Sequence, residues 1–246
     1  MSSSTWTPRA VSSEARAWSA HAWRVVEAQH AASTMKLVDD ADEQALLESL
    51  LEEAKPALPA AAASLHYLLA TPFRYPSARG GSRFRAAVDP GVWYGAQTVR
   101  TACAELGYWR WKFVCDALDL ARLDPVAHTA FRAALATQAV DLRAPPFDAA
   151  APTWTHPSDY AGTQAFARVA RDAGICAIVY ASVRDPQPAW CAAVLSPAAF
   201  SARRPHAGTQ TWWLSVDRAR VRWQRDGEAF TFDTAGWGPP TPSSDG

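Results

Sequence analysis

The C-terminal third of the chain contains a hairpin signal that limits the folds open to it. The tripeptide Arg225-Asp226-Gly227 separates two segments, 221–224 and 228–232, in which apolar and polar residues alternate. An Asp-Gly pair between alternating segments is a strong signal for two antiparallel strands joined by a tight turn. Two further strand-like segments precede it, at 190–195 and 210–216. The end of the chain is therefore predicted to form sheet.

Helices and strands alternate irregularly in the rest of the chain. A helix is predicted at 98–118, starting from a capping threonine, and a second helix at 163–172. The β-prone segment 91–96 and the apolar run 175–183 are predicted strands, the latter fully buried. Leucines at helical spacing predict an amphipathic helix over 42–55. This irregular order, ending in hairpins, indicates an α+β fold with mostly antiparallel sheets and flanking helices.

A single domain accounts for the chain. Its 246 residues are enough to bury a large core, and they contain no repeat and no glycine motif of the dinucleotide or P-loop type. The segment 66–69 is expected to lead into a loop that carries Arg74. Residues 1–17 and the tail 238–246 are expected to be disordered, which leaves 18–237 as the folded domain.

Charge and composition exclude several functions. Lys+Arg 24 and Asp+Glu 24 balance without a basic stripe, so no direct nucleic-acid partner is expected. No apolar run has the length of a signal-peptide core or a membrane span, so we expect a cytoplasmic protein without a membrane partner. The four cysteines are widely spaced, and no Cys/His cluster has zinc-ligand spacing. Neither a disulfide framework nor a metal site is predicted. The sequence does not decide whether the protein forms a homo-oligomer.

Two arginines in the segment 71–110 are candidates for binding a phosphate-bearing ligand. Arg74 lies between Phe73 and Tyr75, before a proline, a setting that can fix a planar guanidinium for bidentate phosphate recognition. Arg83 follows Gly-Gly-Ser, where small residues let backbone amides approach an anion. The alternative for each is a surface arginine near a turn.

Three further side chains are candidates for the same site. Glu105 falls on an apolar face of the predicted helix with Ala102 and Trp109, where a carboxylate must pair with a cation or serve a site. Arg110 is its alternative structural partner. Tyr94 follows Trp93 on a predicted strand, and adjacent residues of a strand point to opposite faces of the sheet. One of the two rings is therefore expected to face the core and the other a cleft. Ser182 lies at the end of the buried apolar run. A polar residue at the end of a central strand often faces a ligand, but many such residues only cap the strand.

Five short motifs of this chain occur in an order and local context that resemble the RES-domain family, bacterial toxins that break down NAD. They are Phe-Arg-Tyr at 73–75, Gly-Ser-Arg-Phe at 81–84, Val-Trp-Tyr-Gly-Ala at 92–96, Ala-Glu at 104–105 and Tyr-Ala-Ser-Val-Arg at 180–184. The resemblance covers about 23–221, and the stretch 23–39 is similar to the N-terminal helical extension of the longer members.

The resemblance implies a fold similar to ADP-ribosyltransferases and an enzyme that cleaves the nicotinamide–ribose bond of NAD by phosphorolysis or hydrolysis. NAD is then a substrate, inorganic phosphate an optional co-substrate, and no cofactor is required. Glu105 would stabilise the oxocarbenium-like transition state. Arg74 and Arg83 would hold the pyrophosphate or an attacking phosphate. The family also implies an Xre-type antitoxin protein as partner.

The remaining roles also follow from the resemblance. Tyr94 would stack on nicotinamide or adenine, Tyr75 would line the same cleft, and Ser182 would bond the ribose or the carboxamide. Two other functions stay open at this point: a protein ADP-ribosyltransferase that uses NAD, and a nucleotide-binding module without catalysis.

Overall fold

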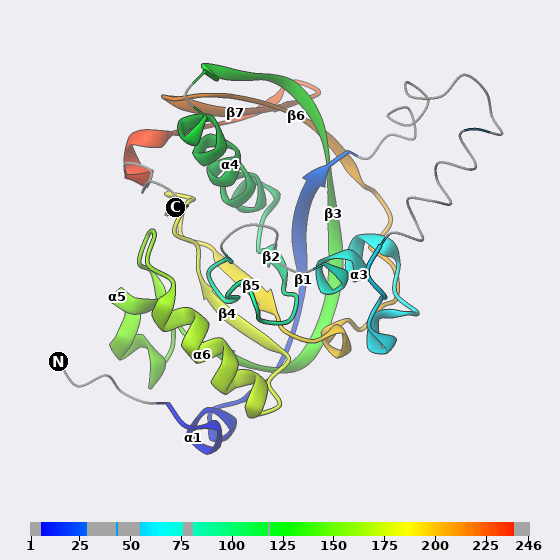
Figure 1. Ribbon diagram of the computed structural model, residues 1–246, viewed down its shortest axis with the longest axis vertical. Coiled ribbons are helices and arrows are strands. Elements are labelled where there is room, and N and C mark those ends of the chain that lie inside the picture. Colours follow the sequence, from blue (N-terminus) through cyan, green and yellow to red (C-terminus); the bar gives the residue numbers. More distant parts are fainter. Residues whose placement is uncertain (1–5, 29–42, 44–54, 76–80, 118, 239–246) are drawn as a thin grey trace.

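The computed structural model describes residues 6–28, 43, 55–75, 81–117 and 119–238. They form one eight-stranded sheet with helices packed on it (Figure 1). The strands are β1 (Arg16–Glu27), β2 (Trp93–Ala96), β3 (Arg122–Asp141), β4 (Ala177–Ala181), β5 (Trp190–Val194), β6 (Gln210–Asp217), β7 (Arg220–Arg225) and β8 (Glu228–Asp233). The helices are α1 (Pro8–Ser13), α3 (Tyr67–Arg74), α4 (Val99–Asp116), α5 (Ala151–Trp154) and α6 (Ala161–Asp172).

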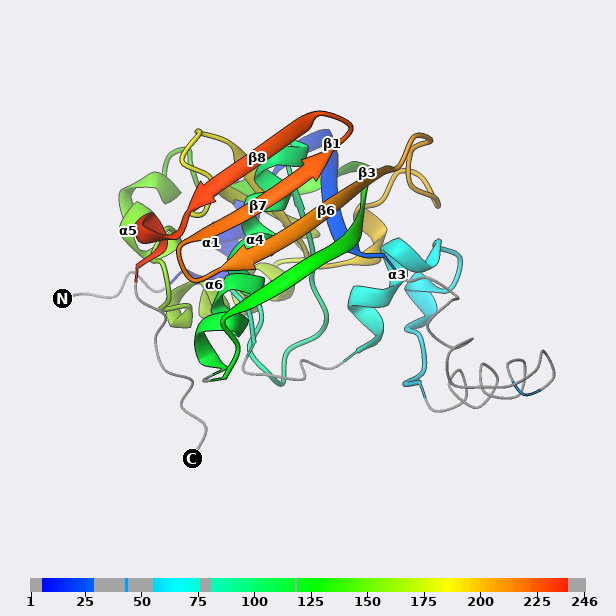
Figure 2. The ribbon, with the colours of Figure 1, turned by 90° about the horizontal axis from the view of Figure 1, so that it is seen from above.

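The sheet closes part of the way around on itself. The strand order is β1-β2-β5-β4-β3-β6-β7-β8, and β1 pairs a second time, with β3. Strands β1, β2, β5, β4 and β3 therefore form a circuit of pairings, while β6, β7 and β8 continue outward from β3 (Figure 2). The pairing of β3 with β4 is parallel, and the other pairings between described strands are antiparallel. The predicted α+β class with mostly antiparallel sheet is confirmed.

The predicted hairpin joins β7 and β8. Arg225 pairs with Glu228, and the two residues between them, Asp226 and Gly227, have φ of 41° and 86°. Positive φ at both central residues is the geometry of the type I′ turn, which matches the right-handed twist of the flanking strands. The local sequence therefore determined this part of the sheet.

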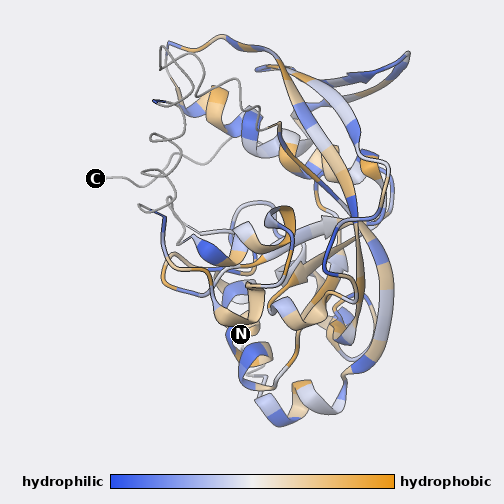
Figure 3. Cartoon of the chain, turned by 90° about the vertical axis from the view of Figure 1, so that its right-hand side faces the viewer, coloured by the Kyte–Doolittle hydropathy of each residue, from blue (hydrophilic) through white to orange (hydrophobic). Residues whose placement is uncertain are grey.

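Helix α4 begins where the sequence predicts. The Oγ1 of Thr98 accepts a hydrogen bond from the backbone N–H of Thr101 at 3.0 Å, which caps the first turn. The helix rests closely on the sheet at Gly107, where an added Cβ would lie 2.7 Å from Cγ1 of Val221 on β7. Figure 3 shows hydrophobic and hydrophilic residues mixed along this helix. Glu105 is one of the polar residues of this helix, and it is half-buried.

The structure differs from the sequence predictions in three regions of the chain. Residues 8–13 form α1 and β1 starts at Arg16, where disorder through residue 17 and a helical extension from residue 23 were expected. Strand β3, at 122–141, was not predicted. Alanine, a weak strand former, occurs six times in β3, and each of the 12 residues of β1 pairs with β3. Tertiary pairing overrides a weak local preference here.

The third difference lies around Arg74. The expected loop is the end of helix α3, which contains Pro72 and continues through Arg74. The predicted helix over 42–55 falls almost wholly outside the described residues, as does the tail from residue 239 onward. The predicted helix at 163–172 is confirmed as α6, and the predicted strand at 175–183 is confirmed as β4.

Candidate active site

A cavity of about 200 Å³ opens between α4, the strands β1 and β2, and the loops that precede α6 and follow β4. Among the described residues, three arginines (Arg24, Arg83 and Arg184) line it, together with one carboxylate, that of Glu105. Aromatic rings make up much of the remaining wall: Trp23, Tyr94, Trp109, Tyr160 and Tyr180. Cationic groups with aromatic walls are suited to an anionic ligand that carries planar rings.

Glu105 lies on the face of α4 that lines the cavity, together with Ala102 and Trp109. The Oγ of Ser182 donates a hydrogen bond to Oε1 of Glu105 at 2.7 Å. The thiol of Cys191 donates to the same oxygen at 3.7 Å. Within the described part of the chain both bonds reach Oε1, so Oε2 is the oxygen available to a ligand. Arg110, the alternative partner, pairs instead with Glu27.

Ser182 is itself held in place by the backbone. Its Oγ accepts hydrogen bonds from the N–H groups of Arg184 at 3.3 Å and Asp185 at 3.2 Å. The hydroxyl hydrogen is therefore directed at Glu105. The hydroxyl therefore orients one oxygen of the carboxylate, and Ser182 is not among the described residues that line the cavity.

Tyr94 joins the wall of the cavity to the loop that carries Arg83. Its hydroxyl bonds with Oγ of Ser82 at 2.7 Å and accepts from the N–H of Phe84 at 3.0 Å. Burial raises the pKa of Tyr94 above its ordinary value, so the phenol stays neutral. The hydroxyl thus fixes the loop, and stacking of the ring on a ligand stays a prediction.

Arg83 is held at the cavity by two carbonyl groups. Its Nη1 donates to the backbone oxygens of Trp154 at 3.0 Å and His156 at 2.9 Å. The guanidinium also lies over the ring of Tyr160, 4.8 Å from the centroid. Its side chain is buried, so it is a fixed cation with the planar geometry that phosphate recognition uses.

Sequence reasoning missed two arginines that line the cavity. Arg24 is on β1, and its Nη1 donates to the backbone oxygen of Tyr94 at 2.8 Å. Arg184 follows β4, is 2% exposed, and lies over the ring of Tyr108 at 3.4 Å. Each arginine lies next to an apolar strand segment in the sequence. A charged residue in that position could have been identified as a candidate for the site.

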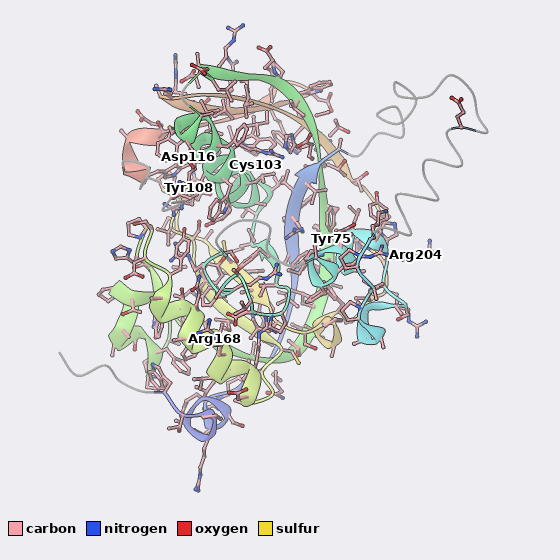
Figure 4. All side chains as sticks on the ribbon, in the orientation of Figure 1. Tyr75, Cys103, Tyr108, Asp116, Arg168 and Arg204 are labelled. Carbon is pink, nitrogen blue, oxygen red and sulfur yellow. The ribbon has the colours of Figure 1, made fainter. Side chains whose placement is uncertain are left out.

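The structure does not bring Arg74 and Tyr75 into the cavity lining. Arg74 ends α3, and its Nε donates to the carbonyl of Pro56 at 2.6 Å. Tyr75 is 38% exposed and its carbonyl accepts from Arg85 at 2.8 Å. Figure 4 shows Tyr75 beside α3, well apart from Tyr108 on α4. The roles predicted for these two residues stay predictions, without support from the geometry of the cavity.

Neither metal ligands nor a disulfide is seen at this site. The described residues contain no group of three or more His, Cys, Asp or Glu side chains that could hold a metal ion. All four cysteines are free, and Cys103 and Cys191 are buried. No helix within the described ranges is both long and apolar enough to cross a membrane.

Comparison with known proteins identifies the family. The model of the RES domain matches residues 57–217, which is well over half of the chain. The chain therefore belongs to the RES domain family, and the resemblance seen in its motifs is confirmed. A search of the curated proteins found no match. Among solved structures, the crystal structure of the M. tuberculosis MbcT-MbcA toxin-antitoxin complex is similar, with a TM-score of 0.47, 11% sequence identity, and coverage of 94% of this chain and 93% of that chain.

Proposed function

We propose that this protein is a toxin enzyme that cleaves the bond between nicotinamide and ribose in NAD. The observation that carries the proposal is the carboxylate of Glu105, which accepts a hydrogen bond from Ser182 at 2.7 Å in a cavity where the other charged lining groups of the described residues are arginines. Membership of the RES domain family supports the same reaction.

The reaction assigns a separate task to each group. The electron pair of the C1′–N bond leaves with nicotinamide, and positive charge builds on the ribose. Glu105, through Oε2, stabilises that charge in the transition state. An oxygen of water or of inorganic phosphate then bonds to C1′, and in the case of water a proton is lost to solvent. Ser182 keeps the carboxylate oriented throughout.

Charged and aromatic groups on the cavity walls support binding of the rest of the dinucleotide. NAD carries a pyrophosphate with two negative charges, and three arginines line the cavity against one glutamate. Trp109 lines it as well and is 41% exposed, so its ring is available for stacking at the mouth. We assign the nicotinamide riboside to the interior beside Glu105 and the adenosine to the mouth.

Product analysis tests the proposal directly. Purified protein is incubated with NAD, with and without inorganic phosphate, and the products are separated by liquid chromatography and mass spectrometry. Free nicotinamide with ADP-ribose indicates hydrolysis, and a phosphorylated ADP-ribose formed only with phosphate indicates phosphorolysis. ADP-ribose bound to protein supports the alternative transferase. Nucleotide binding without release of nicotinamide would contradict the proposal and leave a binding module.

A toxin of this class requires a partner that restrains it. We propose that a separate antitoxin protein of the Xre type covers the mouth of the cavity in the cytoplasm, as the family resemblance implies. Co-expression with the product of an adjacent gene tests this: the partner is expected to co-purify and to suppress release of nicotinamide. An adjacent protein that binds the chain and leaves turnover unchanged would contradict inhibition through the cavity.

A further inference from the structure

Cys191 has a buried thiol beside the carboxylate of Glu105. The residue lies on β5, is 1% exposed and is one of those that line the cavity. Its Sγ lies 3.7 Å from Oε1 of Glu105, within hydrogen-bond range for a sulfur donor. All four cysteines are free, and Cys191 alone among them belongs to the described residues of the cavity lining. Cleavage of NAD does not require a thiol at this place, so its contact with the carboxylate needs an explanation.

The thiol of Cys191 keeps its hydrogen at neutral pH. Burial raises the pKa of Cys191 well above its ordinary value, and the nearby Glu105 raises it further. A neutral thiol is a poor nucleophile, but it can donate a weak hydrogen bond. A carboxylate only accepts hydrogen bonds, so the hydrogen between the two side chains belongs to the sulfur. Cys191 therefore acts on Glu105 as a donor and is unsuited to form a covalent bond with a substrate.

The sheet holds Cys191 in place from both sides. Strand β5 lies between β2 and β4, and Cys191 pairs with Ala96 on β2 and with Tyr180 on β4. The residues that follow it on β5, Ala192 and Ala193, are fully buried. A side chain carried by a strand of the scaffold is positioned more precisely than one on a loop. The sulfur is therefore a fixed point from which a hydrogen can be directed at Glu105.

Two donors thus reach the same oxygen of Glu105 from different parts of the sheet. Ser182, which follows β4, donates to Oε1 at 2.7 Å, and Cys191 donates to Oε1 from β5. The last torsion of a glutamate side chain has a broad energy minimum, so one hydrogen bond leaves the carboxylate some freedom to turn. A second donor at a separate position restricts that rotation. Oε2 then stays the oxygen that is available to a ligand.

We propose that Cys191 is a positioning residue, whose S–H group donates to Oε1 of Glu105 and limits rotation of the carboxylate. The consequence for catalysis rests on the proposed function, in which Oε2 stabilises positive charge on the ribose. The hydrogen bond itself follows from the geometry alone. It is weaker than the bond from Ser182, because a thiol is a weaker donor than a hydroxyl and the distance is longer.

Infrared spectroscopy of the full chain tests the hydrogen bond without requiring catalysis. The S–H stretch absorbs in a region of the spectrum where other protein groups do not, and a hydrogen bond to the thiol lowers its frequency. The band of Cys191 is assigned as the one that Cys191→Ala removes. We expect Glu105→Gln to raise the frequency of this band, since a neutral amide oxygen accepts more weakly than a carboxylate. A band that keeps its frequency in Glu105→Gln overturns the proposal.

Steady-state kinetics with NAD test the consequence for turnover. Cys191→Ala and Cys191→Val both remove the donor, and valine also fills the space, so that water does not take the place of the thiol. We expect both variants to lower kcat about three- to tenfold and to leave KM nearly unchanged. Cys191→Ser keeps a donor and is expected to recover part of the loss. Cys103→Ala is the control and is expected to match the parent, because Cys103 is a buried free thiol of the same core cluster outside the described cavity lining.

The order of the variants separates positioning from packing, and thermal unfolding is recorded for each of them. If Cys191 served packing alone, the apolar valine would preserve turnover better than serine. Positioning through a hydrogen bond requires the reverse order, with serine above valine. Turnover in Cys191→Val that equals or exceeds that of Cys191→Ser overturns the role in the reaction.

The outcome is distinguishable from that of the proposed function. A parent protein that releases no nicotinamide contradicts NAD cleavage, and a band that shifts in Glu105→Gln still supports the hydrogen bond from Cys191. Release of nicotinamide by a parent whose band does not shift, or whose kcat is retained in Cys191→Val, supports NAD cleavage and contradicts positioning by Cys191.

Discussion

The hydroxyl of Ser182 donates to Oε1 of Glu105 at 2.7 Å, across a separation of 77 residues in the sequence. Oγ of Ser182 also accepts hydrogen bonds from two backbone N–H groups, so the hydroxyl hydrogen is directed at Glu105. A hydroxyl held in this way can orient the carboxylate that accepts its hydrogen bond. The role first expected of Ser182, a bond to the ribose or the carboxamide, is replaced in our proposal by positioning.

Ser182→Ala is expected to reduce kcat for NAD cleavage and to leave KM nearly unchanged. The loss of one hydrogen bond to a charged group is worth about 1.5–3 kcal/mol, or roughly 10–100-fold in rate. Ser182→Thr keeps the hydroxyl and is expected to recover most of the rate. Steady-state kinetics of the three proteins provide the measurement, and a rise in KM at constant kcat would instead indicate direct contact with substrate.

Glu105→Gln is expected to bind NAD and to lose most of its turnover. Removal of one group that stabilises charge in a transition state typically costs about 10²–10³-fold in rate. The amide keeps the shape of the carboxylate and can still accept from Ser182, so the fold is expected to persist, which circular dichroism checks. Turnover close to that of the parent enzyme would remove Glu105 from the mechanism.

Arg83→Lys is expected to weaken NAD binding more than Arg74→Lys does. Arg83 lines the cavity and donates hydrogen bonds to two backbone carbonyl groups. Arg74 is the last residue of α3 and is not among the residues that line the cavity. Lysine cannot reproduce the planar fork, and we expect a loss of about tenfold at Arg83. Calorimetry with each variant compares the two positions. A larger loss at Arg74 would restore the role that its motif first suggested.

Induction of the chain alone in cells is expected to lower cellular NAD and to stop growth before lysis. The Glu105→Gln protein, at equal abundance, is expected to be tolerated. This comparison separates catalysis from misfolding, because misfolding of a hydrophobic chain would not spare the variant. NAD is measured by an enzymatic cycling assay. Growth arrest at unchanged NAD would point to modification of a protein target.

The free energy of unfolding is expected to fall in alkali. Burial raises the pKa of Tyr180 well above its ordinary value, and the nearby Cys191 and Glu105 raise it further. A phenol that is neutral in the folded state and ionises near pH 10 when unfolded contributes stability below about pH 10, and this contribution is lost as the pH rises toward the folded pKa.

Tyr180→Phe tests this linkage. Denaturant unfolding at about pH 8 and about pH 11 is expected to show a smaller loss of stability in this variant than in the parent, because the unfolded state then has one phenol fewer to ionise. Tyr67→Phe serves as the control, since Tyr67 is 55% exposed. Equal losses in the two variants would show that Tyr180 does not contribute to the alkaline transition.

The sequence alone determined the features whose signals are local. Asp226-Gly227 encodes its turn through backbone conformation at two adjacent residues, and Thr98 encodes the start of α4 through one capping bond. Glu105 was identified because a carboxylate on an apolar helix face requires an explanation, and the motifs around it were sufficient to recognise the RES domain family.

The tertiary structure alone decided which residues meet at the cavity. Strand β3 is rich in alanine, and β1 and β3 are held extended by pairing with each other, so no local pattern predicts Arg24 beside Tyr94. Arg184 follows a strand in the sequence, but only the tertiary structure places its guanidinium over the ring of Tyr108 and against the hydroxyl of Tyr160. Donor atoms acquire or lose partners through contacts between distant segments, and no local pattern records those contacts.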